Sequence, residues 1–172
     1  MKISVKQVAV MVITFLATVF VLRAATWVYT ESAVHTPLIQ TVRAVPGVAR
    51  ATWLEGGAVE VALKPSADLM QTYEAVRSRI QAFGQPADPV IDPGNPSPAL
   101  TSLANQLRFA IAQGEATGQY VEMDRTILAM ARGAGVEASV ELGNTHLFIT
   151  LRQGNHYLFQ VLPLNLGGGG HG

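Results

Sequence analysis

The chain has 172 residues, with 12 lysine and arginine residues, 12 aspartate and glutamate residues and no cysteine. Without cysteine, a disulfide framework, a thiolate metal site, an iron–sulfur cluster and a thiol nucleophile are all excluded. A formal net charge of zero with so few basic residues argues against nucleic-acid binding. Apolar residues make up 49% of the chain and charged residues only 14%, so part of the chain must be nearly free of charge.

The least charged part is an apolar run over residues 7–22, which basic residues flank on both sides. Apolar residues continue beyond Arg23, so a helix over residues 5–28 is long enough to cross a bilayer. A cleaved secretory signal is the alternative, since an apolar stretch of this length also suits one. Its cleavage positions around Ala33 are interrupted by polar residues, however. We therefore expect residues 1–30 to be a cytoplasmic flank and an uncleaved transmembrane signal anchor.

The charges around this span predict its orientation. Lys2, Lys6 and the terminal amine precede the span, whereas Arg23 follows it, and the more basic flank of a single span stays in the cytoplasm. From Glu31 onward the chain carries 9 basic and 12 acidic residues, a surplus that disfavours anionic partners. We expect a single-pass protein of the cytoplasmic membrane that contacts lipid through its N-terminal span, with its main domain outside and no nucleic-acid partner.

Residues 36–84 show the pattern helix, hairpin, helix, which predicts a first αββα module. A helix ends at Pro46-Gly47, and a hairpin of two strand-like segments follows it. A second helix, capped by Ser66, then carries apolar residues at intervals of three and four until Gly84 ends it. The two predicted strands cover residues 48–54 and 59–63.

Sliding the sequence by 88 residues superposes the two halves in pattern. Gly47-Val48 then falls on Gly135-Val136, in each case a helix end followed by a hairpin. The superposition turns Arg50 inward in the first strand, whereas hydrophobic matching turns Ala49, Ala51 and Trp53 inward. Both registers stay open at this point.

A proline-rich linker divides the two halves. Five prolines lie within residues 85–98, which predicts a semi-rigid, extended connector. Val90 and Ile91 have the character of a short edge strand inside it.

Residues 99–163 predict a second, ααβββ module. Apolar residues at helical spacing indicate a helix closed by Gly114 and another helix over residues 119–132. A three-stranded meander follows, and the glycine-rich residues 164–172 are expected to form a flexible tail.

Turn residues predict the register of this meander. A two-residue Gly143-Asn144 turn pairs Val140 with Leu147, and a three-residue loop in the second hairpin pairs Ile149 with Phe159. One face is then apolar across all three strands, as a correct register requires. That face carries Val136, Ala138, Val140, Leu147, Ile149, Leu151, Tyr157, Phe159 and Val161.

A membrane segment followed by small αββ units, with Val-Pro-Gly-Val at residues 45–48 leading into the first hairpin, resembles the ring-building-motif domains. Those domains occur in type III secretion systems, in flagella and in the sporulation channel between mother cell and forespore. The chain is also similar to the ferredoxin-like periplasmic domains of type IV pilus and type II secretion proteins, and to heavy-metal-associated domains, whose metal loop needs cysteines that it lacks. The resemblance covers residues 37–63 and 123–162 and implies modules that pack side by side into oligomers.

The side chains that support chemistry are scattered. Glu137 and Glu141 project from one strand, whereas a glycosidase-like pair needs two carboxylates that face each other across a cleft. Ser66 and Ser97 stand at predicted helix starts, as capping residues do. No two histidines have the i, i+4 spacing of a metal-binding pair; they are His35, His146, His156 and His171. We therefore predict no catalytic residue, no metal, no cofactor and no enzymatic activity.

The face of the meander opposite the predicted core is unusually apolar. In the predicted register it carries Phe148, Leu158 and Leu162, beside Arg152. Either the linker or the first module covers this face, or it is a contact surface for another subunit, or the register is misassigned. We take these four residues as the candidate interface.

Two functional hypotheses follow. The first is an α+β protein with an N-terminal transmembrane helix and two αββ-type modules, acting as a non-enzymatic structural or interaction subunit of a bacterial cell-envelope assembly. Its partners are other subunits of that assembly or further copies of itself. The alternative is an extracytoplasmic small-ligand sensor or binding domain, with a pocket between the modules near Trp53, Tyr73 and Tyr120.

Overall fold

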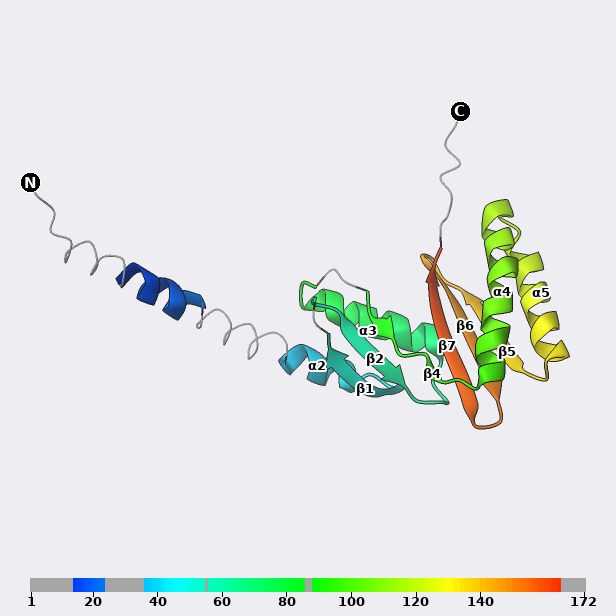
Figure 1. Ribbon diagram of the computed structural model, residues 1–172, viewed down its shortest axis with the longest axis horizontal. Coiled ribbons are helices and arrows are strands. Elements are labelled where there is room, and N and C mark those ends of the chain that lie inside the picture. Colours follow the sequence, from blue (N-terminus) through cyan, green and yellow to red (C-terminus); the bar gives the residue numbers. More distant parts are fainter. Residues whose placement is uncertain (1–13, 24–35, 55, 86–87, 165–172) are drawn as a thin grey trace, which may run out of the picture.

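A computed structural model describes residues 14–23, 36–54, 56–85 and 88–164 of the chain. These residues form an α+β fold with five helices and two sheets, one of three strands and one of four. In Figure 1 the two sheets, each with helices of its own, follow one another along the long axis of the molecule. The predicted α+β class is therefore confirmed.

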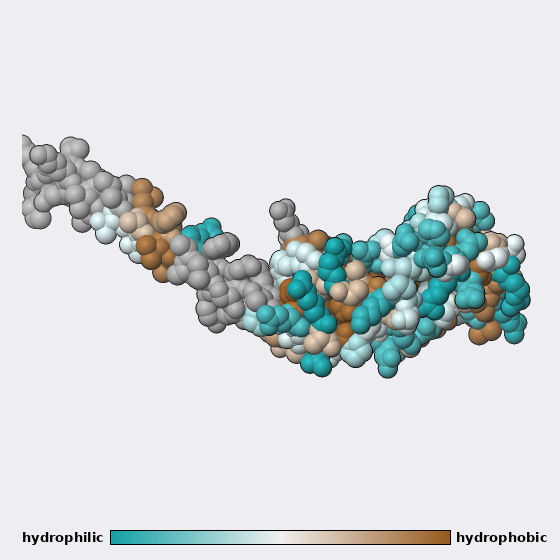
Figure 2. Space-filling view, turned by 90° about the horizontal axis from the view of Figure 1, so that it is seen from below, coloured by the Kyte–Doolittle hydropathy of each residue, from teal (hydrophilic) through white to brown (hydrophobic). Residues whose placement is uncertain are grey.

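Most of the predicted membrane span, residues 5–28, falls outside the described residues. The part that is described, residues 14–23, forms a helix. All ten side chains of this helix are exposed, including Phe15 at 68% and Phe20 at 75%, and Figure 2 shows its apolar surface. Over the residues described here, no helix combines the length and the apolar character that crossing a bilayer requires. The transmembrane anchor stays a prediction.

The first sheet and its two helices come from the segment in which helix, hairpin and helix were predicted. The N-cap of the long helix is Asp68, whose carboxylate accepts a hydrogen bond from the Gln71 N–H at 2.8 Å, so the predicted Ser66 cap is wrong by two residues. Gly84, at φ +73°, follows the last turn as predicted. The elements are α2 (Thr36–Arg43), β1 (Val48–Trp53), β2 (Val59–Leu63) and α3 (Leu69–Ala82).

The register that turns Ala51 and Trp53 inward is correct beyond Arg50, but a bulge in the strand leaves Ala49 exposed and Val48 buried. The pairing with β2 shifts between Val48 and Arg50. An extra residue in one strand lets side chains on both sides of the bulge face the same way. Val48 and Ala51 are thus both buried, at 5% and 0% exposure, while Arg50 is exposed.

The proline-rich segment is bonded to both sheets. Its predicted strand is β3 (Val90–Ile91), which runs parallel to β2, and a second strand, β4 (Gly94–Asn95), runs antiparallel to β7 (His156–Pro163). Two further backbone bonds extend these pairings, from Asp92 N–H to Val61 C=O at 2.9 Å and from Phe159 N–H to Pro93 C=O at 3.0 Å. The segment therefore ties the sheets together.

The second sheet has the strand order β4-β7-β6-β5 and carries two helices on one face (Figure 1). The first of these helices continues past Gly114, where we predicted its end. A β-carbon at Gly114 would lie 2.6 Å from Met123 Cβ, so this glycine is the point of closest approach between two helices and not a helix end. The elements are α4 (Pro98–Thr117), α5 (Tyr120–Gly133), β5 (Glu137–Leu142), β6 (His146–Gln153) and β7.

The predicted face of the β5–β6 hairpin is confirmed, but its pairing is offset by two residues. Val140 lies opposite Ile149 and not Leu147, and Gly143 donates to His146 C=O at 2.9 Å. Gly143 does not supply a positive φ for the turn; a β-carbon there would lie 2.8 Å from the Phe148 ring. An offset of two keeps every side chain on its own face.

The predicted register of the β6–β7 hairpin is wrong by one residue. Gln153 pairs with His156, so Gly154 and Asn155 form a two-residue turn, with Gly154 at φ +59°. An offset of one turns each side chain of β7 to the opposite face. Both faces of the strand are packed, so alternation of apolar and polar residues could not locate its core face.

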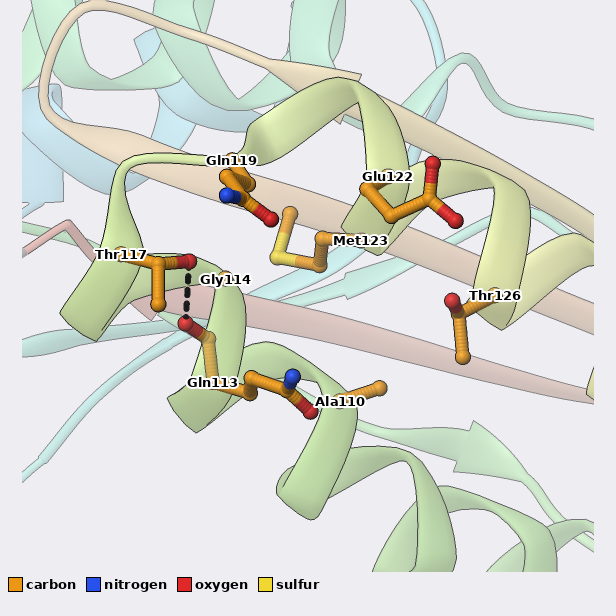
Figure 3. Close-up of a pocket in the computed structure, with 8 residues that line it drawn as sticks. All are labelled: Ala110, Gln113, Gly114, Thr117, Gln119, Glu122, Met123 and Thr126. Carbon is orange, nitrogen blue, oxygen red and sulfur yellow. Dashed lines mark hydrogen bonds between the residues drawn. The ribbon is translucent and has the colours of Figure 1, made fainter.

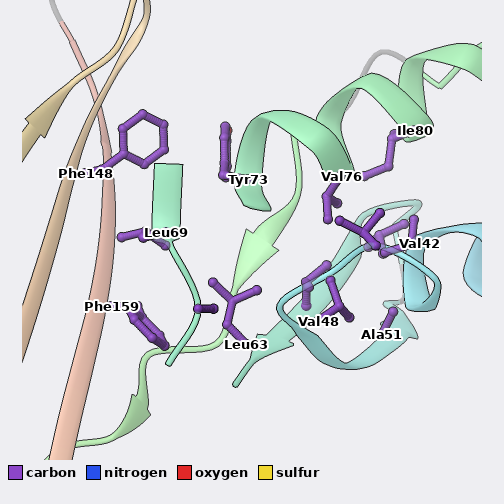
Figure 4. Packing of buried hydrophobic residues seen from close by; sticks show 14 of the residues in the cluster. Val42, Val48, Ala51, Leu63, Leu69, Tyr73, Val76, Ile80, Phe148 and Phe159 are labelled. Carbon is purple, nitrogen blue, oxygen red and sulfur yellow. The ribbon is translucent and has the colours of Figure 1, made fainter. Parts of the chain in front are cut away.

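Two hydrophobic cores result, one on each face of the second sheet. The first core lies between α2, α3 and the first sheet and also takes in Phe148 and Phe159 from the second sheet, as Figure 4 shows. The second core lies between that sheet and α4 and α5, and contains Leu147, Ile149 and Leu158. The first module therefore covers the face of the second sheet that the helices leave open.

Candidate functional site

The predicted interface residue Phe148 lies between the two modules. Only 1% of its surface is exposed, and its ring meets that of Tyr73 from α3 edge-on, with centroids 5.2 Å apart. Figure 4 shows the two rings side by side, with Leu69 close to them. Of the interpretations of this face, cover by the first module is correct for Phe148.

Arg152, also predicted at the interface, bonds to the loop that precedes α3. Its NH2 group donates to Pro65 C=O at 3.0 Å and to Ala67 C=O at 3.3 Å. Its Nε is buried without a hydrogen-bond partner. The guanidinium therefore holds the second sheet against the first module.

Leu158 and Leu162 lie on the other face of the sheet, so their assignment to the predicted surface is wrong. The one-residue offset of β7 turns them toward α4, where Leu158 is 6% exposed and Leu162 packs at the margin of the second core. The four candidate residues are thus divided between two internal contacts and form no common exposed surface.

A polar cluster that the sequence did not indicate lies at the same contact between modules. Tyr73 Oη is 3.2 Å from His146 Nε2, and His146 Nδ1 is 2.9 Å from Thr145 Oγ1. Arg77 NH1 approaches the same hydroxyl at 3.4 Å. The residues are 68 to 73 positions apart along the chain, so only the packing of α3 against β6 brings them together.

Asp88, from the proline-rich segment, completes this cluster. Its Oδ1 lies 2.8 Å from Arg77 Nε, an ion pair in which the N–H is not directed at the carboxylate. Its Oδ2 lies 3.6 Å from His146 Nε2. Three parts of the chain, α3, the proline-rich segment and β6, therefore meet at one point.

Burial fixes the protonation of the tyrosine. Burial, followed by the negative charge of Asp88, raises the pKa of Tyr73 from 10.0 to about 12. The phenol keeps its proton near neutral pH and shares a hydrogen bond with His146 Nε2, while His146 Nδ1 shares another with the Thr145 hydroxyl. Both imidazole nitrogens are then occupied and His146 is 8% exposed, so the cluster joins the modules and offers no free base to a substrate.

The remaining candidate groups do not gather. His156 lies at the other end of the β6–β7 hairpin, with Nδ1 3.2 Å from Asn95 C=O, while His35 and His171 lie outside the described residues. Glu141 accepts a hydrogen bond from the neighbouring Ser139 hydroxyl at 3.3 Å. Within the part of the chain that the structure describes, no three histidine or carboxylate side chains are placed to hold a metal ion.

The pocket expected near Trp53, Tyr73 and Tyr120 does not form from these residues. Trp53 packs against the first core and Tyr120 against the second. A hollow between α4 and α5 near Gly114 holds only about 50 Å³ (Figure 3). A larger, open cleft of about 700 Å³ lies between the start of α3 and the β5–β6 turn.

Comparison of the chain with protein-family models, with characterised proteins and with solved structures finds no match. The functional conclusion therefore depends on the geometry and on the sequence pattern.

Proposed function

We propose that the chain is a non-enzymatic, single-pass subunit of a bacterial cell-envelope assembly. Its N-terminal span anchors it in the cytoplasmic membrane, and its two small α+β modules stand outside and pack against partner subunits. The observation that carries the proposal is the union of the two modules into one body, with apolar and polar side chains of both modules packed at their contact.

Three contacts support a rigid union of the modules. Phe148 enters the core of the first module, Arg152 bonds to the loop before α3, and Tyr73 shares a hydrogen bond with His146. The proline-rich segment adds a backbone connection, since β3 and β4 belong to different sheets. Contacts of this kind favour a single arrangement of the two modules, and fixed surfaces are what a structural subunit requires.

Two features support the anchor and the assembly. The helix over residues 14–23 exposes large apolar side chains, which is costly in water and favourable in a bilayer. The order helix, strand, strand, helix, strand from α2 to β3 agrees with the resemblance to envelope domains that pack side by side.

Labelling of introduced cysteines tests the location. Because the chain has no cysteine of its own, a single substitution gives an unambiguous signal. In intact spheroplasts, a membrane-impermeant maleimide should label Ser78→Cys, on the exposed side of α3, and should label Ser4→Cys only after lysis. Labelling of Ser78→Cys only after lysis would place the modules inside and overturn the proposal.

Mass measurement tests the assembly. The full chain in detergent micelles, measured by light scattering over a range of concentrations, should form oligomers or should enter a larger complex when isolated from its own membranes. A monomer under both conditions would contradict a role as an assembly subunit.

A further inference from the structure

Strand β5 forms an open edge of the second sheet. It pairs with β6 on one side and has no neighbour on the other. Because Gly143 bonds to His146 and bonded pairs alternate in an antiparallel ladder, the backbone groups of Ala138, Val140 and Leu142 point away from β6. Among the described residues none bonds to these outward groups, so β5 offers a row of free N–H and C=O groups.

The outer sides of β1 and β7, the other strands of five residues or more with an open side, are partly closed. On β1, the Arg43 guanidinium donates twice to Ala51 C=O, from Nε at 3.2 Å and from NH2 at 2.9 Å. On β7, β4 pairs with the outer side and Pro93 C=O takes the Phe159 N–H, while Pro163, the last residue of the strand, has no N–H to offer. The free edge of β5 is thus a particular feature of this strand.

The 700 Å³ cleft described above lies beside the end of this edge. One wall is the start of α3, with Asp68, Met70 and Glu74, and the other is the turn that follows Leu142. Leu142 is 50% exposed. The cleft therefore offers apolar surface and two carboxylates next to the unpaired backbone of β5.

The charge around the edge is negative. Glu137 and Glu141 project from the face of β5 that looks away from α4 and α5, and Asp68 and Glu74 line the cleft on the same side. Two arginines also lie on this side. Arg77 is 2.8 Å from Asp88 and 4.0 Å from Glu74, and Arg152, opposite Glu137 in the ladder, donates to Pro65 C=O. The carboxylates of Asp68, Glu74, Asp88, Glu137 and Glu141 outnumber these two cations. Charge complementarity thus favours a basic occupant.

We propose that β5 binds an extended, basic segment of another protein by strand addition. The inference rests on the proposed function, since it names the kind of partner that an interaction subunit would bind. Side chains on one face of the added strand would meet Val140 and Leu142 and should be apolar, whereas those on the other face would meet glutamates and should be lysine or arginine. The six residues of β5 match a segment of about 20 Å.

A second copy of the chain fits this edge less well. Two β5 strands paired antiparallel would bring Glu137 and Glu141 of both chains onto one face of the joined sheet. Four carboxylates on one face repel each other, and charged edge residues are a known guard against pairing between copies.

The probe is a labelled octapeptide of alternating lysine and valine, titrated against the full chain in nanodiscs of zwitterionic lipid, with empty nanodiscs as the control. Binding should be saturable and should slow hydrogen exchange at the amides of Ala138, Val140 and Leu142. The same peptide with glutamate in place of lysine should not bind. Equal binding of both peptides, or binding without protection of these amides, overturns the proposal.

Two sets of variants separate the contribution of backbone hydrogen bonds to peptide binding from the contribution of charge. Val140→Pro removes an outward N–H without touching the bonds to β6 and should weaken binding at least about tenfold, the loss of about 1.4 kcal/mol, whereas Val140→Thr, which keeps the N–H, should bind as the parent does. The double variant Glu137→Lys and Glu141→Lys should bind the glutamate peptide in place of the lysine peptide. This reversal of the peptide preference tests the proposed binding even where Val140→Pro fails to fold.

The outcomes distinguish the inference from the proposed function. Labelling of Ser78→Cys from outside together with absence of peptide binding overturns strand addition alone. Dimers that Val140→Pro abolishes would assign the edge to a second copy and overturn the basic partner.

Discussion

Alkaline pH tests the contact between the modules at Tyr73. Burial, at 1% exposure, together with the charge of Asp88 raises the pKa of this phenol to about 12 in the folded chain, against 10.0 for an unperturbed tyrosine. The folded state therefore holds the proton more tightly than the unfolded state. The resulting stabilisation is complete below pH 10 and is lost as the pH rises toward 12.

The magnitude follows from the size of the shift. A displacement of about two pKa units corresponds to about 2.7 kcal/mol, of which about 2 kcal/mol is lost by pH 12, where half of the folded molecules have ionised. Tyr73→Phe has no proton to lose but also lacks the hydrogen bond to His146, which costs it about 1 kcal/mol near neutral pH.

Loss of the hydrogen bond in the variant and ionisation of Tyr73 in the parent chain make their curves of unfolding free energy against pH cross. Urea unfolding of the full chain in detergent micelles, followed by circular dichroism, should show the parent chain as the more stable at neutral pH and the Tyr73→Phe variant as the more stable near pH 12. The variant corrects for every other group that titrates in this range. Parallel curves would refute the burial of the phenol, as would a tyrosinate absorbance that rises in full around pH 10.

Two further predictions concern packing, and urea unfolding measures both. Gly114→Ala should destabilise the chain, because overpacking against Met123 costs about 1 to 3 kcal/mol and alanine gains only about 1 kcal/mol in helix propensity. Gly133→Ala is the control: a β-carbon there meets open space, so this substitution should stabilise the chain. Equal effects of the two substitutions would contradict the close approach of Gly114 to Met123. Phe148→Ala should cost about 3 to 5 kcal/mol, whereas Phe109→Ala, at 83% exposure, should change stability by less than about 0.5 kcal/mol.

Local pattern predicted the elements well where one side of an element faces solvent. The helix expected to end at Gly84 runs over Leu69–Ala82, because its buried positions recur every three or four residues. The strand at Val90–Ile91 was expected from two apolar residues among prolines and is present as β3. The β5–β6 face was also correct, since β5 is packed on one side only.

Two glycines serve packing between elements where the sequence pattern predicts a helix end and a turn. Gly114, the predicted helix end, lies against Met123, and Gly143, the predicted turn residue, lies beneath the Phe148 ring. Glycine serves both to end or turn an element and to let two elements pack closely. Which role a given glycine has depends on which side chain of another element comes close to it.

The sequence contained one indication of the polar cluster, and it lay at Tyr73. Tyr73 occupies an apolar position of its helix, and a buried phenol needs a hydrogen-bond partner. The sequence could not identify His146 as that partner, because the two residues lie 73 positions apart.

The sequence by itself determined the α+β class, the zero net charge and, β4 apart, the order of helices and strands, because these depend on composition and on periodicity within single elements. Only the tertiary structure decided that the two modules form one body, that Phe148 and Arg152 face inward, and that β5 is left with an open edge. Those features depend on contacts between elements that are distant in the chain. Strand β7 shows the reason, because it is packed on both faces and carries apolar side chains on each, so the sequence did not indicate its register.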